Sequence, residues 1–349
     1  MPRDGNTPAF RLAHHGALIA ISVVFALPLI WMISTSLKPV EQTLADPPTF
    51  VPRATVEMAI DQAQANVQRL EVEGLSGTER HERAVSRLEA LQAGDAPVDI
   101  VATLAQQAAD NYVGTTATTP DGMQVEVTRG VWTDPVIDFP LYLRNTLIIA
   151  FLSVTGMVIS SAVVAYGFSR VQWRLRGPLF ILVLATMMIP FPVLMGPLYL
   201  LFKELGWIGT FKPLWVPAWF GGAFNIFLLR QFYMTIPKEL DEAARIAGCS
   251  HLGIFLRIIL PLSRPALAVV ALFHFIFVWN DFLGPLIFLQ KQDQFTLALG
   301  LQLYQSQAGN VPWNLLMAAS TLVVLPVLVL FILTQRTFVE GIATQGLKE

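Results

Sequence analysis

Long apolar runs restrict this sequence to one class of fold. Six stretches are almost wholly apolar, and each has the roughly 20 residues that an α-helix needs to cross a hydrocarbon layer about 30 Å thick. The chain as a whole is 54% hydrophobic and only 14% charged, unlike an average soluble domain. We therefore expect an integral membrane protein with helical spans, because a helix satisfies its own backbone hydrogen bonds in lipid. The six predicted spans are residues 13–34, 143–168, 178–202, 213–232, 265–288 and 315–333.

The third predicted span contains helix-breaking residues. Pro190, Pro192 and Pro197 stand inside it, with Gly196 beside the last of them. Proline removes a backbone donor and bends or breaks a helix, and a membrane tolerates such breaks where neighbouring helices or a water-filled cavity satisfy the freed groups. The sequence leaves open whether these breaks shape the packing or line a pathway.

Basic residues predict the orientation of the spans. With the N-terminus placed in the cytoplasm, the cytoplasmic segments carry 12 Lys and Arg residues, against three in the two short outer loops. This asymmetry follows the positive-inside rule. The first span is followed by no small-residue cleavage site, so we expect it to be retained rather than removed as a signal peptide. The inner set is Arg3, Arg11, Arg170, Arg174, Arg176, Arg230, Lys238, Arg245, Arg257, Arg264, Arg336 and Lys348, and the outer set is Lys203, Lys212 and Lys291.

A polar insert, residues 39–138, separates the first two spans. Apolar residues recur at helical spacing from Val56 to Leu70 and again from His81 to Leu91, with a break at EGLSGT between them. Residues 98–108 are also compatible with a helix, and MQVEV, after a TPDG turn, alternates as a strand does. These patterns predict a small, mostly helical extracytoplasmic domain. Its role is either that of a passive spacer or that of a docking surface.

Two short helices are predicted in the cytoplasmic segment DEAARIAGCSHLGIFLRIILPLSRPALA, which begins at Asp241. Acidic residues favour the N-terminal end of the first helix, and Gly248 can adopt the left-handed conformation that ends it. Ser250 is a suitable N-cap for the second helix, which we expect to stop at Pro261. Such a pair of helices suits insertion into a groove on another protein.

The same segment carries a spaced motif that resembles a known family. The pattern E-A-A, three residues, G, nine residues, I-x-L-P is the signature of the permease subunits of binding-protein-dependent ABC importers. Further stretches, such as MMIPFPVLMGPLYLL and VWNDFLGPLIFL, are similar to the carbohydrate-uptake branch, the type found in the inner-membrane subunits for maltose. The resemblance covers residues 11–52 and 138–349. The residues of this chain that match the signature motif are Glu242, Ala243, Ala244, Gly248, Ile258, Leu260 and Pro261.

The resemblance implies a role in coupling rather than in catalysis. In such importers a short helix, here starting near Glu239, sits in a cleft of a cytoplasmic ATPase. Glu242 would then pair with a basic residue of the ATPase, Ala243 and Ala244 would allow close approach, and Gly248 would permit the turn. The plainer alternative for Glu242 is a charge that stabilises the helix N-terminus. The resemblance assigns ATPase coupling to Glu239, Glu242, Ala243, Ala244, Gly248, Ile258, Leu260 and Pro261.

This chain departs from the family in two places. Ala247 stands where relatives usually carry an aspartate, just before the signature glycine. In addition, the family normally joins its first two spans with a much shorter segment, so the insert is not explained by the resemblance.

Few polar residues lie inside the predicted spans, and intramembrane polar groups are functional candidates. We predict that Asn225, Asn280 and Asp281 line or gate the translocation path. For Asp281 three roles stay open, namely capping a half-helix, binding sugar hydroxyls, or gating. An ion-coupled secondary transporter that uses Asp281 and His274 is the alternative reading, but it gives no reason for the cytoplasmic signature.

Several chemistries lack their sequence features. There is no G-x-x-x-x-G-K-[ST] loop to hold nucleotide phosphates, so ATP would be bound by a partner subunit and no cofactor by this chain. We expect no catalytic site and no metal site, and the net charge of −2 argues against nucleic-acid binding.

The sequence therefore predicts an all-α integral membrane permease with six transmembrane helices and a helical extracytoplasmic insert. Its parts are residues 1–38 (cytoplasmic N-terminus and first span), 39–138 (insert) and 139–349 (five-helix core with a coupling loop at 236–263). The resemblance implies five partners, namely a second homologous permease, a cytoplasmic ATPase dimer, an extracytoplasmic solute-binding protein, membrane lipid and a sugar substrate. The expected location is the bacterial or archaeal cytoplasmic membrane, with both termini in the cytoplasm. Polyols, glycerol phosphate esters and disaccharides remain open as substrates.

Overall fold

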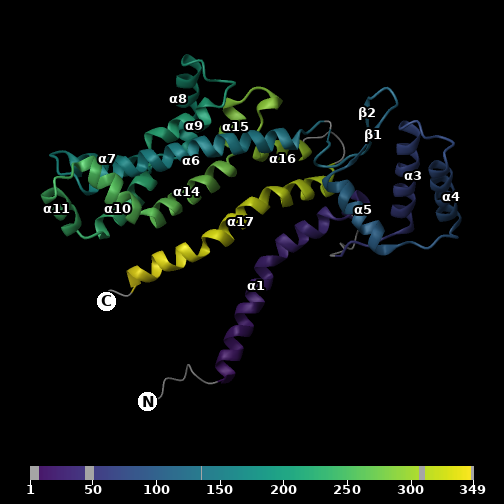
Figure 1. Ribbon diagram of the computed structural model, residues 1–349, viewed down its shortest axis with the longest axis horizontal. Helices are drawn as coiled ribbons and strands as arrows, with labels where there is room; N and C mark the ends of the chain where they lie inside the picture. Colours follow the sequence, from purple (N-terminus) through teal and green to yellow (C-terminus); the bar gives the residue numbers. More distant parts are fainter. Residues whose placement is uncertain (1–7, 44–50, 135, 306–310, 347–349) are drawn as a thin grey trace. The chain divides into compact units, whose positions relative to one another are not determined.

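Helices make up most of the structure. The computed structural model describes residues 8–43, 51–134, 136–305 and 311–346, so the predicted inner charges Arg3 and Lys348 lie outside the described residues. Within these ranges the only sheet is a two-stranded one. The chain divides into two compact units, Met1–Phe139 with Leu301–Val324, and Pro140–Gly300 with Leu325–Glu349 (Figure 1).

The first unit contains the insert, and side-chain caps begin its three main helices. Thr55, Thr78 and Asp99 each accept a hydrogen bond from a backbone N–H in the first turn, which satisfies a donor that the helix itself leaves unpaired. A left-handed Gly94 ends the second of these helices. The elements are α1 (Pro8–Ser36), α2 (Val40–Thr43), α3 (Val56–Val72), α4 (Glu79–Ala93), α5 (Ile100–Tyr112), β1 (Thr115–Thr118) and β2 (Gln124–Thr128).

The described part of the insert contains helices α2 to α5 and strands β1 and β2, and the buried positions of α3 differ in part from the expected ones. Helices α3 and α4 pack side by side, and α3 also contacts α5 and both strands (Figure 1). In α3 the buried side chains are Met58, Ala59 and Leu70, whereas Val56 is 52% exposed. The apolar face expected from Val56 to Leu70 is therefore wrong at its N-terminal end. The reason is that α3 is covered by neighbouring elements on two sides, rather than along one face.

One buried side chain ties the insert to the ends of two long helices. Asn111 of α5, 2% exposed, donates from Nδ2 to the Ser36 and Lys38 carbonyl oxygens, each at 2.8 Å. Its Oδ1 accepts from Gln107 Nε2 at 3.0 Å and from Asn314 Nδ2 at 2.9 Å. Asn314 belongs to α17 (Trp313–Gly346). Asn111 thus links the end of α1, the insert and the start of α17.

The second unit contains the long helix α6 and a series of shorter helices around it. Its buried core includes side chains of α6, α10, α14 and the predicted coupling segment, residues 236–263. The elements are α6 (Phe139–Ser169), α7 (Arg176–Thr186), α8 (Phe191–Glu204), α9 (Lys212–Trp215), η2 (Val216–Phe220), α10 (Ala223–Thr235), α11 (Glu239–Ile246), α12 (His251–Ile254), η3 (Phe255–Ile259), α13 (Leu260–Leu262), α14 (Arg264–Trp279), α15 (Leu283–Phe288), η4 (Gln292–Gln294) and α16 (Leu297–Gln305).

Two of the predicted spans are single long apolar helices. These are α6 and the Trp313–Thr334 part of α17, with mean hydropathies of 2.4 and 2.7. Among the described residues, two further helix pairs reach spanning length only together. One is α7 with α8, bent by 98°, and the other is His251–Leu262 with α14, bent by 76°.

The remaining predicted spans are less regular than the hydropathy pattern indicates. The third is broken between Thr186 and Phe191, with Pro190 at the N-cap of α8, and this matches its expected proline break. The fourth is divided among α9, η2 and α10, and the fifth is interrupted after Trp279, before α15 begins at Leu283. In α1, residues Ile21–Ser36 form a shorter apolar helix. By length and composition the described residues thus provide two spans, or up to four if each bent pair counts as one.

Candidate coupling site

The predicted coupling helix is α11, and it ends as the sequence indicates. Gly248 has φ +84°, and a Cβ placed there would meet nothing within 4 Å. The requirement for glycine is therefore conformational rather than spatial. Cys249 N donates to the Ala244 carbonyl and Gly248 N to the Arg245 carbonyl, each at 2.9 Å. These two bonds form a Schellman motif. The first turn carries Glu239, Asp241 and Glu242.

The second short helix begins as predicted but continues further. Ser250 Oγ accepts from Gly253 N at 3.2 Å and caps it. The expected stop at Pro261 is wrong, because the chain stays helical to Leu262. Residues Phe255–Ile259 form a π-turn, which shifts the hydrogen-bond pattern immediately before the proline and so accommodates its missing donor. The bend into α14 follows this helical stretch.

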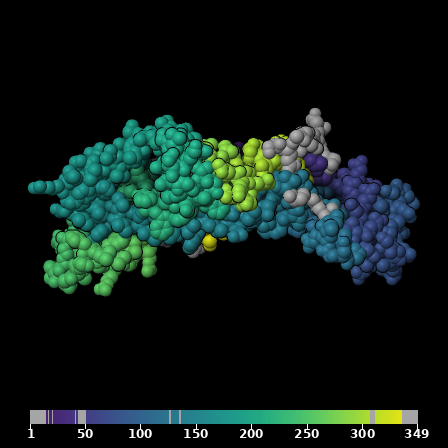
Figure 2. Space-filling view, turned by 90° about the horizontal axis from the view of Figure 1, so that it is seen from above, coloured from purple at the N-terminus to yellow at the C-terminus, as the bar shows by residue number. Residues whose placement is uncertain are grey.

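One face of α11 packs against the protein and the other is exposed. Ala244 is 9% exposed and belongs to the core of the second unit, and its predicted role in the close approach of a partner stays a prediction. Glu239, Glu242 and Ala243 are exposed, and Ile246 is 89% exposed. Figure 2 shows this part of the second unit as a projecting green lobe.

Exposed apolar side chains continue along the next helical stretch. Leu252 is 65% exposed and Leu256 is 50% exposed, while Ile254 and Phe255 are buried in the core. We define the coupling surface as six of the exposed residues of this segment, namely Glu239, Glu242, Ala243, Ile246, Leu252 and Leu256. It combines apolar side chains with two carboxylates, which suits docking into a groove that offers apolar contacts and a basic residue.

A buried ion pair holds α11 in place. Arg170, just after α6, and Asp241 are 7% and 5% exposed. Arg170 Nη1 lies 3.1 Å from Asp241 Oδ2, and its Nη2 donates to the Tyr233 and Ile236 carbonyl oxygens. One guanidinium thus joins the end of α6, the end of α10 and the start of α11. Removing one partner of a buried pair leaves an uncompensated charge.

The sequence interpretation missed this pair. It treated Arg170 only as an inner positive charge and Asp241 only as a helix N-terminal charge. The two residues are 71 positions apart, so no local spacing connects them. One local feature indicates that Asp241 is buried. It stands three residues before Ala244, and residues three apart share one face of a helix, so Asp241 lies on the same buried side of α11 as Ala244.

The remaining signature residues lie between core and surface. Ile258 and Leu260 are half-buried and pack against the core of the second unit, whereas Pro261 is exposed. In this structure Ile258 and Leu260 support the coupling segment from within. Their assignment to ATPase coupling stays a prediction.

The residues predicted for the translocation path are not joined by hydrogen bonds in the described structure, and their role stays a prediction. Asn225 in α10 is 7% exposed, and Asn280 Nδ2 donates to the Ile276 carbonyl at 2.8 Å. Asp281 Oδ1 accepts from Gly284 N at 3.0 Å, which is the geometry of a cap on α15. No hydrogen bond among the described residues joins Asn225 to Asn280 or Asp281.

The cavity beside Asp281 is too small for a sugar. It measures about 10 Å³ and is also lined by Thr146 and Thr296, so it is about the size of one water molecule. His274 lies in α14, where its Nε2 is 2.8 Å from Ser153 Oγ in a buried contact. That geometry is the one of a hydrogen-bonded core histidine. Within the described residues, no group of three His, Cys, Asp or Glu side chains could hold a metal ion.

Comparison with known proteins identifies the family. Residues 156–343 match the family described as binding-protein-dependent transport system inner membrane component. The match therefore covers the coupling segment, the predicted path residues, the C-terminal part of α6 and most of α17.

Curated relatives come from the same kind of transport system. The trehalose/maltose transport system permease protein MalG of Thermococcus litoralis is 37% identical over 62% of this chain and 79% of its own length. The arabinooligosaccharides transport system permease protein AraQ of Halalkalibacterium halodurans is 37% identical over 58% of this chain and 72% of its own. The sn-glycerol-3-phosphate transport system permease protein UgpE of Shigella flexneri is 32% identical over 70% and 87%.

A solved structure shares the fold. The crystal structure of a bacterial ABC transporter involved in the import of the acidic polysaccharide alginate aligns with a TM-score of 0.65 at 18% identity, covering 96% of this chain and 99% of that one. This likeness concerns the fold alone. Together with the family match and the curated relatives, it leads to one conclusion: the chain belongs to the binding-protein-dependent transport system inner membrane components.

Proposed function

We propose that this chain is the permease subunit of an ATP-driven importer and forms the translocation path for a sugar or oligosaccharide. The substrate would be delivered by a solute-binding protein, and a separate ATPase would supply the energy. The chain itself acts without catalysis, since its part is to change conformation when the partner hydrolyses ATP.

The coupling surface is the observation that carries this proposal. Helix α11 is rigidly anchored by the Arg170–Asp241 pair and closed by the left-handed Gly248, while it exposes Glu242 and Ile246. A helix that is fixed to the membrane core on one face and free on the other can transmit a movement of one protein to another. Such transmission is an allosteric coupling between distinct sites. An ion-coupled transporter has no use for this arrangement.

The substrate class follows from the relatives. Two of the three relatives named above carry a saccharide in their names, trehalose/maltose and arabinooligosaccharides, and the third carries sn-glycerol-3-phosphate. We therefore favour a saccharide over a polyol phosphate. The cavity beside Asp281 holds no more than a water, so a sugar-sized path requires a second permease subunit to complete it.

In the proposed complex this chain is joined by three other kinds of protein. A second, homologous permease completes the path, a cytoplasmic ATPase dimer engages the coupling surface, and an extracytoplasmic solute-binding protein delivers the sugar. The family name supports the dependence on a binding protein.

We propose six spans with both termini in the cytoplasm and the insert outside. Helices α1, α6 and α17 would be three of them, and the third, fourth and fifth would be broken helices. Broken spans are compatible with a membrane where they line a cavity or are covered by neighbouring helices. The protein would reside in a bacterial or archaeal cytoplasmic membrane.

Reconstituted transport tests the proposed function. The chain is co-purified with its permease and ATPase partners, placed in liposomes, and given radiolabelled sugars with binding protein outside and ATP inside. We expect uptake only when both ATP and binding protein are present. Uptake that follows an ion gradient without ATP would overturn the proposal.

Cysteine labelling tests the proposed topology. Cys249 is the only cysteine in the chain, so Cys249→Ser gives a background for single new cysteines. A membrane-impermeant maleimide should label Ser76→Cys in the insert from outside intact cells, and should label the native Cys249 only after the membrane is opened. Labelling of Cys249 in intact cells would contradict the orientation.

A further inference from the structure

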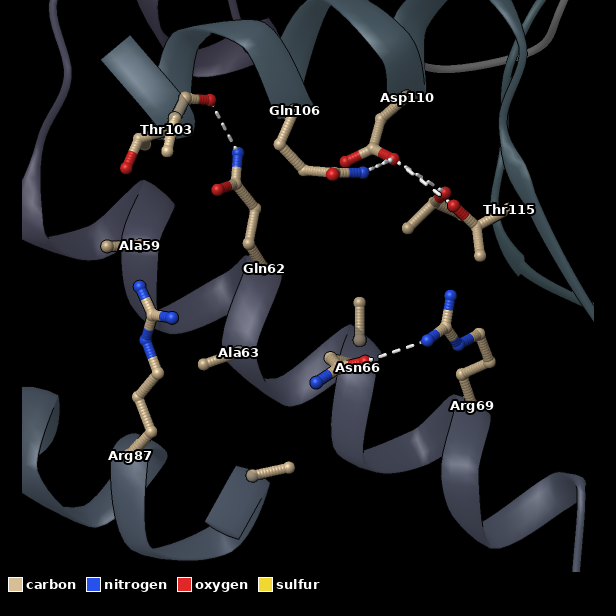
Figure 3. Close-up of a pocket in the computed structure, with 14 residues that line it drawn as sticks. Ala59, Gln62, Ala63, Asn66, Arg69, Arg87, Thr103, Gln106, Asp110 and Thr115 are labelled. Carbon is tan, nitrogen blue, oxygen red and sulfur yellow. Dashed lines mark hydrogen bonds between the residues drawn. The ribbon is translucent and has the colours of Figure 1, made fainter. Parts of the chain in front are cut away.

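A polar cavity of about 340 Å³ lies within the insert. It is bounded by α3, α4, α5 and the two strands, which the structure packs together. Figure 3 shows polar side chains from α3 and α5 facing one another across it. Its volume lies at the lower end of the range of small-molecule sites. Nothing in the coupling mechanism uses these residues.

A buried carboxylate forms one wall of this cavity. Asp110 is 9% exposed, and its Oδ1 accepts from Gln106 Nε2 at 2.9 Å and from the Thr115 and Thr128 hydroxyls at 3.3 Å each. Oδ2 makes no hydrogen bond to any described residue, although Asp110 lines the cavity. Burial raises the pKa of the Asp110 carboxyl, against the opposing effect of its three hydrogen bonds. The side chain is thus fixed in place with one acceptor atom left over.

Two guanidinium groups line the same cavity. Arg69 Nη2 donates to Asn66 Oδ1 at 3.2 Å, and its Nε is 3.8 Å from Glu73. Arg87 of α4 makes no hydrogen bond or ion pair with any described residue. Neither arginine is within ion-pair distance of Asp110 in the described structure, so the cavity keeps positive and negative groups apart. In Figure 3 the Arg69 guanidinium reaches from α3 toward the end of the cavity where Asp110 and Thr115 lie.

Neutral polar groups and small side chains complete the lining. Gln62 Nε2 donates to the Thr103 carbonyl at 2.9 Å, which leaves its side-chain oxygen without a partner in the described structure. Ala59 and Ala63 leave open space beside it, and none of the described lining residues is aromatic. A ligand here would be held by hydrogen bonds and charge rather than by stacking.

We propose that this cavity binds a small hydroxylated carboxylate, a sugar acid of the uronate type. The carboxylate would accept hydrogen bonds from Arg69 or Arg87, whose planar donor forks match a carboxylate. The hydroxyls would donate to Asp110 Oδ2 and to the Gln62 oxygen. Such a ligand bridges the separated charges and satisfies both kinds of group.

Other ligand classes fit these residues less well. A phosphate dianion would meet the Asp110 carboxylate, and like charges repel. A neutral sugar would leave the Arg87 guanidinium without an anion and would find no aromatic ring among the described lining residues. An amino acid would use Asp110 with its ammonium group but would leave the amide groups of Gln62 and Asn66 unused.

Direct binding to the full chain tests this inference. The chain is held in lipid nanodiscs without ATPase or binding protein, and galacturonate binding is followed by calorimetry, with galactose and alanine as comparison ligands. We expect saturable binding of galacturonate and at least about tenfold weaker binding of the other two, since a hydrogen bond to a charged group is stronger than a neutral one. Equal or tighter binding of galactose or alanine would overturn the proposal. Because the assay involves no transport, its failure would leave the proposed importer function untouched.

Matched variants locate the binding. Of Arg69→Gln and Arg87→Gln, the variant that removes the arginine bound to the carboxylate should weaken galacturonate binding by about tenfold. Arg83→Gln, at an exposed arginine that pairs with Glu79 on the same helix, should leave binding unchanged. Asp110→Asn keeps an acceptor for the three existing hydrogen bonds and replaces Oδ2 with a donor, so it should weaken binding while the insert stays folded. Ala63→Phe should fill the cavity and abolish binding. Binding that is unchanged in these variants would show that the sugar acid sits elsewhere and would overturn the assignment.

Discussion

The coupling segment and the insert are each anchored by one buried polar side chain, but by different chemistry. Arg170 holds α11 through an ion pair with Asp241 and two backbone carbonyls. Asn111 holds the insert through four neutral hydrogen bonds to α1, α5 and α17. A buried charge is strongly destabilising once its partner is removed, whereas an unpaired neutral group costs less.

The difference matches what each region is proposed to do. Helix α11 has to move together with the membrane core when a partner protein moves. The buried Arg170–Asp241 ion pair attaches it firmly to that core. The insert has only to keep its place beside two helix ends. This comparison predicts a ranking of mutational effects.

Arg170→Met should have the largest effect. It leaves Asp241 buried without its cation, and we expect α11 to lose about 3–5 kcal/mol of anchoring free energy. ATP-dependent uptake in liposomes should fall by more than about tenfold. Arg174→Met, at an exposed arginine four residues on, serves as the matched control. Equal uptake by the two variants would show that the ion pair is not needed for coupling.

Asn111→Ala should have a smaller effect, and on stability rather than on coupling. It leaves the Ser36 and Lys38 carbonyls without their partner, and we expect a loss of about 1–3 kcal/mol. The readouts are the thermal midpoint of the purified chain and its resistance to proteolysis in the insert. Gln64→Ala, at an exposed amide, is the control. A larger loss of coupled uptake for Asn111→Ala than for Arg170→Met would reverse the comparison.

Gly248→Val should affect the turn alone. A residue with a Cβ is disfavoured in the left-handed conformation by about 1–2 kcal/mol, so the chain after α11 should be redirected and hydrolysis uncoupled from uptake. We would measure the ratio of ATP hydrolysed to sugar imported. Gly177→Val in α7, where a Cβ would meet nothing within 4 Å and φ is not positive, should leave that ratio unchanged. An unaltered ratio in both variants would remove the turn from the mechanism.

Glu242→Lys should have the smallest effect on the fold. The helix loses about 0.3–1 kcal/mol of dipole interaction, but ATPase co-purification should drop because an exposed carboxylate of the coupling surface is reversed. Glu57→Lys makes the same change in the first turn of α3 and so controls for the dipole effect. Normal recovery of the ATPase with Glu242→Lys would reduce Glu242 to a helix-stabilising charge.

Local features of the sequence predicted local features of the structure. The Gly248 turn, the Ser250 cap and the helices of the insert follow from short-range rules about glycine, N-caps and periodicity. The family motif also located the coupling segment within the chain. Each of these features lies within one short segment of the sequence.

Apolar length alone was a weaker guide to the spans. It correctly marked α6 and the apolar part of α17 as spanning helices. It treated the run at 213–232 as one helix, although the backbone there divides into three pieces. Hydropathy records which residues tolerate lipid, and it does not record where the backbone breaks.

By itself, the sequence determined the class of protein, its family and the segment proposed to couple to a partner, because composition and a spaced motif carry that information. Only the tertiary structure decided which side chains anchor that segment and what the insert encloses. Arg170 and Asp241 are 71 residues apart, and Asp110 faces arginines that belong to two other helices. Contacts of this kind depend on how helices pack, and pairwise packing over long separations leaves no periodic trace in a single sequence.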